Sequence, residues 1–95
     1  MHVRWSAHAR SRREEIFDYI SPDNPDAALH LDESFSSSAR LLESLPNIGR
    51  TGRIEGTREL VVQAHYILVY EVAEDIVEIL TIQHTSQHYP PDNLC

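Results

Sequence analysis

An arginine- and glycine-rich segment in the middle of the chain has the residue types needed to bind an anion. The segment GRTGRIEGTREL, residues 49–60, holds all three glycines and three of the eight arginines of a protein whose formal net charge is −7. Glycines permit positive φ angles and close backbone approach, and arginines present forked donors to phosphate or carboxylate. Arg50, Arg53 and Arg58 are therefore candidates to contact RNA phosphates or the carboxylates of a protein partner.

The same segment also has a purely structural interpretation. It lacks the GxxxxGK[ST] spacing and the lysine of a phosphate-binding P-loop. Its arginines can instead pair with Glu55, with Glu59 or with acids on a helix, because pairing among surface charges is common and usually weak. Both interpretations, anion binding and internal pairing, follow from the residue types.

A second group of reactive side chains follows the last predicted strand, in the stretch from His84 to Tyr89. His84 or Tyr89 could act as a general acid or base if a substrate lay within hydrogen-bond reach. The alternative is a histidine at a strand end that makes a structural hydrogen bond. His84 and His88 are four residues apart, but the sequence places no cysteine or carboxylate near them, so we expect no zinc site, no other metal and no cofactor.

Length and composition limit the classes of protein. A chain of 95 residues predicts one domain over 1–95, folded over 1–90 with a flexible tail at 91–95. No apolar run approaches the ~20 residues of a membrane span and no signal peptide is visible, so we expect a soluble cytoplasmic protein. The single cysteine, Cys95, cannot form an internal disulfide. A pI near 5.2 argues against sequence-blind binding of nucleic acid.

The hydrophobic pattern predicts the elements that position these groups. A short alternating strand is followed by a helix with Ser6 as its cap, and Asn24 with Pro25 begins a second helix that Pro46 ends. The serine run 36–38 inside that helix is a weak point in helix propensity. Three strands then follow, with a tight turn at 74–75. The expected bounds are 2–5, 7–20, 24–45, 59–62, 66–72 and 76–84. The fold class is α+β, in the order β-α-α-β-β-β, with a helical hairpin on one face of a small, mostly antiparallel sheet.

The strand 66–72 is apolar on both sides. Tyr66 and Tyr70 share one face, and Ile67 and Val69 share the other. This pattern predicts a central strand with the helices on one side. The other side would be covered by a partner chain or by the chain's own tail. Tyr66 and Tyr70 are therefore candidate contacts for a target or a partner protein.

The order of elements and the motifs resemble the RelE/ParE superfamily of bacterial toxins. The resemblance is carried by GRTGRIEGTRELVV, followed by HYILVYEV and EDIVEILTIQHTSQHYP, and preceded by VRWSAHA and EIFDYISPDNPDAALHL. It covers nearly the whole chain up to Pro90. It implies the compact toxin fold of a type II toxin-antitoxin module and a cognate antitoxin whose C-terminal segment wraps the toxin. The two chains would form a hetero-oligomer, and operator DNA would be contacted only through the antitoxin.

The superfamily includes two mechanisms. RelE-like members cleave mRNA on the ribosome, which would put Arg58 at the scissile phosphate, Arg50 and Arg53 on the RNA backbone, and His84 or Tyr89 in proton transfer. ParE-like members are not nucleases: they bind DNA gyrase and poison it. The absence of lysine and the acidic net charge make phosphate neutralisation harder, and this favours a ParE-like, plasmid-stabilising toxin. A third possibility is a non-toxic homologue that acts only within an antitoxin-bound repressor complex.

Overall fold

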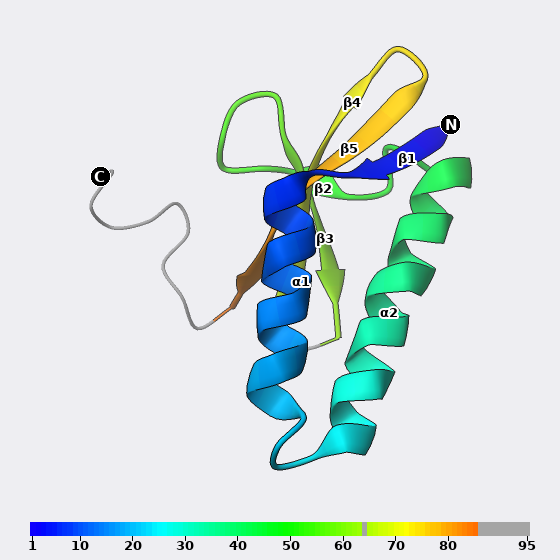
Figure 1. Ribbon diagram of the computed structural model, residues 1–95. Helices are drawn as coiled ribbons and strands as arrows, with labels where there is room; N and C mark the ends of the chain where they lie inside the picture. Colours follow the sequence, from blue (N-terminus) through cyan, green and yellow to red (C-terminus); the bar gives the residue numbers. More distant parts are fainter. Residues whose placement is uncertain (64, 86–95) are drawn as a thin grey trace.

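The architecture consists of two helices packed on one face of a five-stranded sheet (Figure 1). The structure is a computed structural model that describes residues 1–63 and 65–85. The predicted tail 91–95 and the predicted folded segment 86–90 lie outside these residues. The elements are β1 (His2–Trp5), α1 (Ala7–Ile20), α2 (Pro25–Ser44), β2 (Arg50–Thr51), β3 (Arg58–Val62), β4 (Tyr66–Ala73) and β5 (Ile76–His84).

Both helices begin where the sequence predicts. The Ser6 side chain accepts a hydrogen bond from the backbone N–H of Ala9 at the start of α1. At the start of α2, the Asn24 side chain accepts from the N–H of Ala27, and Pro25 occupies the first turn. Each cap satisfies a backbone donor that the helix itself leaves without a partner. The helix α2 ends at Ser44, two residues before Pro46, because proline cannot continue a helix.

The sheet has the strand order β1-β5-β4-β3-β2 and is mostly antiparallel, as predicted. β1 lies parallel to β5, with Val3 opposite Val77, whereas the remaining neighbours are antiparallel. The prediction of four strands was incomplete. The short strand β2 pairs Arg50 with Glu59 and Thr51 with Arg58, and a strand of two residues is too short to produce a period in the sequence.

The core lies between the sheet and the two helices. Phe35 and Leu42 of α2 pack with Leu68, Tyr70 and other side chains of the central strands, all of them at most 1% exposed. Ile67 and Val69 form a second, smaller cluster, which confirms the predicted division of β4 between two faces. A register shift between Val69 and Tyr70 marks a β-bulge in the pairing of β4 with β5.

In the described ranges, no helix is long and apolar enough to cross a lipid bilayer.

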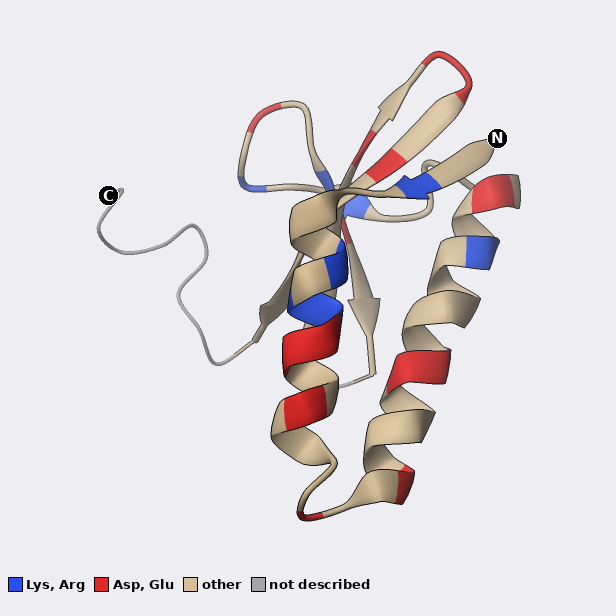
Figure 2. Ribbon diagram, in the orientation of Figure 1, with Lys and Arg blue, Asp and Glu red and all other residues tan. Residues whose placement is uncertain are grey.

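The distribution of charge is uneven over these elements (Figure 2). Arginines occupy the first half of α1, and acids occupy its second half and the tip of the β4–β5 hairpin.

Candidate functional site

The arginine-rich segment forms the junction between the helices and the sheet. Arg50, in β2, donates from Nε to Oε1 of Glu59 at 3.1 Å, and its Nη2 lies 3.0 Å from the same oxygen. The Arg50 side chain is 56% exposed, but that of Glu59 is 1% exposed. A carboxylate this deeply buried requires a charged or hydrogen-bonding partner. Arg50 therefore has an internal partner, as the structural interpretation of the segment predicted.

Arg53 belongs to the same arrangement through its backbone. Its N–H donates to Oε2 of Glu59 at 3.2 Å, so both oxygens of the buried carboxylate are used. The loop that carries Arg53 stands clear of the helices in Figure 1, and Figure 2 shows its charges. Ile54, next in the loop, is 45% exposed. The Arg53 side chain thus lies on an outer loop whose base Glu59 holds in place.

Arg58 directs its guanidinium toward the backbone of the helix-to-sheet connection. Its Nη1 donates to the carbonyl oxygens of Gly49 at 2.8 Å and of Asn47 at 3.3 Å. Arg58 is half-buried. These bonds hold the connection against β3, which is a structural role for a residue that the RelE-like alternative would place at a scissile phosphate.

Tyr70 anchors the same connection from inside the core. Its hydroxyl accepts from the N–H of Gly49 at 2.9 Å and donates to the carbonyl of Pro46 at 2.8 Å. The residue is 0% exposed, so in this conformation its side chain offers no surface to a partner. The predicted contact of Tyr70 with a target or antitoxin does not fit this placement, because the hydroxyl and ring are both used inside the protein.

A separate cluster of aromatic rings occupies the opposite end of β4. The Tyr66 and His84 rings meet edge to face with centroids 4.9 Å apart, and the rings of His65 and His84 stack at 5.6 Å. Phe35 of α2 packs against Tyr66 from the core. Imidazole is the side chain that most often acts as a general acid or base, and a phenol can also do so. The sequence identified Tyr66 and His84, but not the stacking of His65 on them.

The Tyr66 phenol is affected by its surroundings. Burial raises the pKa of the Tyr66 phenol above its usual value of 10.0, and the Tyr19 phenol adds to the rise. The Arg12 guanidinium opposes this effect on the pKa. Arg12 is itself held by the carbonyl of Ile82 and by Glu15. The phenol therefore keeps its proton at neutral pH.

Two of the residues that the RelE-like alternative would make catalytic, Arg58 and His84, lie at different places along the sheet. Arg58 lies opposite Tyr70 on β4, whereas His84 lies opposite Tyr66. These two positions of β4 are four residues apart, which is about 13 Å along a strand. Tyr89 and His88 lie outside the described residues. Within residues 1–63 and 65–85, no group of three or more metal-binding side chains occurs.

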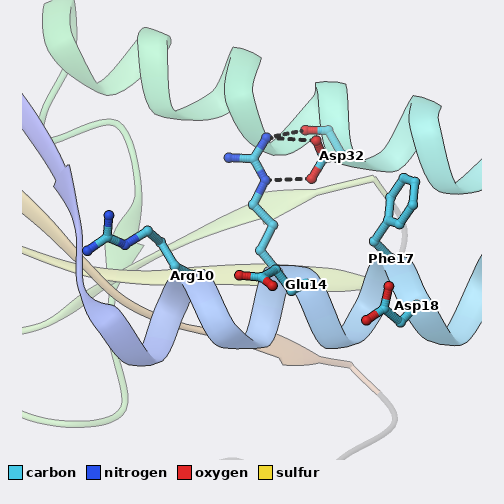
Figure 3. Close-up of a pocket in the computed structure, with 6 residues that line it drawn as sticks. Arg10, Glu14, Phe17, Asp18 and Asp32 are labelled. Carbon is cyan, nitrogen blue, oxygen red and sulfur yellow. Dashed lines mark hydrogen bonds and ion pairs between the residues drawn. The ribbon is translucent and has the colours of Figure 1, made fainter.

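A pocket between the two helices was not expected from the sequence. It has a volume of about 340 Å³ and lies between Arg10, Arg13 and Phe17 of α1 and Asp32 of α2 (Figure 3). Arg13 donates from Nε and Nη2 to the two carboxylate oxygens of Asp32, at 2.6 and 3.0 Å. Its guanidinium also lies 4.8 Å from the Trp5 ring centre. This bidentate pair fixes the helices to each other; the helical spacing of 10, 13 and 17 was the signal for a shared face.

Comparisons with known proteins identify relatives of this chain. Residues 3–89 match the family model described as ParE toxin of type II toxin-antitoxin system, parDE. A protein of Sinorhizobium fredii named "Putative toxin Y4kP" is 42% identical over 93% of this chain and 92% of its own length. Toxin RelE2 of Caulobacter vibrioides is 33% identical over 90% of this chain and 96% of its own.

The fold is also shared with a solved structure. A chain described as the chromosomal ParDE TA system from P. aeruginosa superposes with a TM-score of 0.79 at 20% identity, over 88% of this chain and 95% of that one. At this identity the likeness concerns the fold. The match of the family model to nearly the whole chain carries the assignment: the protein belongs to the family of ParE toxins of type II toxin-antitoxin systems.

Proposed function

We propose that this toxin stops bacterial growth by binding and poisoning DNA gyrase, and that its cognate antitoxin neutralises it. The family supplies the toxin-antitoxin context and implies the antitoxin partner. The observation that carries the choice of target is the separation of Arg58 from His84 along β4. Plasmid stabilisation and a cytoplasmic location belong to the same proposal.

Phosphodiester cleavage needs cationic donors aimed at the charge that develops on the phosphate. Arg58 instead donates to two backbone carbonyls of its own chain, and Arg50 pairs with a buried carboxylate. Moving either side chain onto RNA would break these bonds. Because these donors are used inside the chain, they are poorly placed to stabilise charge that develops on a phosphate, whereas a protein contact needs only the exposed parts of the same side chains. This supports a protein target over an RNA target.

The proposed contacts with gyrase or antitoxin are the exposed side chains of the junction and the edge of the aromatic cluster. Arg50 and Arg53 are exposed, and Arg58 and Tyr66 are half-buried, so all four can touch a partner without unfolding. Operator DNA would be reached only through the antitoxin, in a hetero-oligomer of the two chains.

A second candidate function is mRNA cleavage on the ribosome. It is favoured by the cluster of His65, Tyr66 and His84 and by the relative named Toxin RelE2. In that case His84 or Tyr89 would transfer a proton. A third candidate is a non-toxic homologue that acts only inside the antitoxin-bound complex, in which case expression of the chain alone would leave growth unchanged.

The test is to express the chain without antitoxin and to measure growth, gyrase supercoiling, double-strand breaks and ribosome-dependent mRNA cleavage. We expect growth arrest with inhibited supercoiling and DNA breaks. The matched variant is His84→Gln, which keeps size and hydrogen bonding but removes the imidazole; it should remain toxic. Cleavage of mRNA by the parent chain that disappears in His84→Gln, with supercoiling unaffected, would contradict the proposal. Arg58→Ala is a poor test, because it also removes the bonds that hold the junction.

A further inference from the structure

A groove runs between α2 and the outer edge of β3, on the far side of α2 from the Arg13–Asp32 pair. One cavity of about 390 Å³ is lined by His30, Glu33, Ser34 and Ser37 of α2 and by Val61 and Gln63 at the end of β3. A second cavity of about 410 Å³ shares His30 and Gln63 and continues to Asn24 and Asp26. Because the two cavities have His30 and Gln63 in common, they lie next to each other and together make up the groove.

The strand that borders this groove has an unpaired edge. The strand β2 pairs with Arg58 and Glu59. Within residues 1–63 and 65–85, no strand lies beside residues 60–62 on that edge. The N–H of Gly52 donates to the carbonyl of Thr57, and backbone groups alternate in direction along an antiparallel strand. The N–H and C=O of Val61 therefore face outward, and Val61 is 49% exposed. An open edge of this kind accepts a further strand.

Serines on one side of α2 explain why there is room beside this edge. Ser34 and Ser37 have short side chains, which leave the groove open, and their hydroxyls can donate and accept hydrogen bonds. The Gln63 side chain donates to Oγ of Ser34 at 3.0 Å, so it joins the end of β3 to α2 at the place where the two cavities meet. The low helix propensity of these serines costs a few tenths of a kcal/mol each, which the packing of Phe35 and Leu42 on the other side of α2 offsets.

The chemistry of the groove indicates the charge of its occupant. Glu33 and Asp26 line it, and no arginine or lysine is among the described residues that do so. The whole chain has a formal net charge of −7. One and two turns beyond Ser37 along the same side of α2 lie Leu41 and Leu45, which are 41% and 49% exposed. The groove is thus acidic and polar along α2, and the exposed Leu41 lies beyond it on the same side of the helix.

We infer that this groove binds an extended, basic segment of the antitoxin as an additional strand on the edge of β3. The backbone of the segment pairs with Val61, its basic side chains face Glu33 and Asp26, and an apolar residue contacts Leu41. From Asn24 to Ser38 the helix is about 21 Å long, which matches about six residues of extended chain. The inference rests on the proposed function for the identity of the partner, the antitoxin, and is independent of the toxin's cellular target.

The test compares two substitutions of exposed helix serines in complexes with the cognate antitoxin. Ser37→Arg puts bulk and positive charge into the groove, and Ser11→Arg makes the same change on α1, away from it. We expect Ser37→Arg to weaken antitoxin binding at least tenfold by calorimetry, and Ser11→Arg to change it less than twofold. Equal affinities for the two variants would overturn the inference.

Hydrogen exchange followed by NMR gives a second measurement that needs no variant. The amide of Val61 should exchange at least tenfold more slowly in the complex than in the free chain; unchanged exchange at Val61 would overturn the inference. In the free chain, protection of the Val61 amide could instead rise with protein concentration while the molecular mass in solution is that of a dimer. That result would identify a second copy of the chain as the occupant and would also overturn the inference. Growth arrest by the free Ser37→Arg chain is measured separately from antitoxin affinity. If the toxin proves not to act on gyrase, the comparison of antitoxin affinities therefore still tests the groove.

Discussion

The two halves of β3 differ in how far their polar groups are satisfied within the chain. At Arg58 and Glu59, the strand is paired on both sides, its buried carboxylate has two donors, and Tyr70 closes the connection from the core. From Leu60 to Gln63, the described chain places no strand on the outer edge. The same strand is therefore closed at one end and open at the other.

This difference shows that a concentration of arginines can hold the fold together as well as offer exposed groups to a partner. Arg50 and Arg58 attract attention in the sequence, yet both have partners inside the molecule. The open half has no arginine and contains ordinary residues, Val61 and Gln63. In this half of the strand, the backbone of Val61 is the group available to a partner.

The largest effect is expected at the closed half from Gly49→Ala. A Cβ at Gly49 would lie 2.6 Å from the Tyr70 hydroxyl oxygen and 2.8 Å from the carbonyl oxygen of Glu59, so the connection must move and the Tyr70 hydrogen bonds weaken. We expect the free energy of unfolding to fall by about 3 kcal/mol, measured by urea denaturation.

The matched control for Gly49→Ala is Gly56→Ala. Gly56 has a φ of +84°, and a Cβ there would meet nothing within 4 Å, so only the cost of a left-handed alanine applies, about 1 kcal/mol. A loss at Gly49 no larger than the loss at Gly56 would show that the Tyr70 anchor contributes little to the closed half.

A smaller effect at the closed half is expected from Arg50→Ala. The substitution leaves the Glu59 carboxylate buried, with the N–H of Arg53 as one remaining donor. We expect a loss of about 1 to 2 kcal/mol in the free energy of unfolding, because the half-exposed Arg50 position lets water reach the carboxylate. The double variant Arg50→Ala with Glu59→Gln should recover part of that loss; a double variant less stable than the single one would argue against this pairing as the cause.

Much of the fold could be predicted from the sequence because its signals are local. Ser6, Asn24 and Pro25 mark helix starts by chemistry that acts within a few residues, and the alternation of β4 separates Tyr66 from Ile67. The strand β2 could not be predicted, since its pairing with β3 depends on a loop closure and leaves no periodic pattern in two residues.

The site was less predictable because its contacts are distant in sequence. Tyr70 and Gly49 are 21 residues apart, and no local pattern indicates that a strand tyrosine holds a glycine amide. The pairing of Arg50 with Glu59 was one of several alternatives that charge alone allowed. The serine run was visible, but its location beside an open edge depends on the packing of α2 against β3.

The smallest effect is expected at the far end of β4, where Tyr66 lies opposite Val62 at the end of the open half. Burial raises the pKa of the Tyr66 phenol above 10.0, so at high pH the unfolded chain loses this proton before the folded chain does. The ionisation of Tyr66 therefore lowers the free energy of unfolding as the pH rises past 10 and has no effect below about pH 9.

The measurement is urea denaturation at pH 8 and pH 10.5 of the parent chain and of Tyr66→Phe. The variant should lose less stability between the two pH values, whereas Tyr19→Phe, at a position that is 84% exposed, should retain most of the decline. An identical decline in the parent chain and in Tyr66→Phe would mean that Tyr66 is as accessible to water as the open edge of β3 beside it.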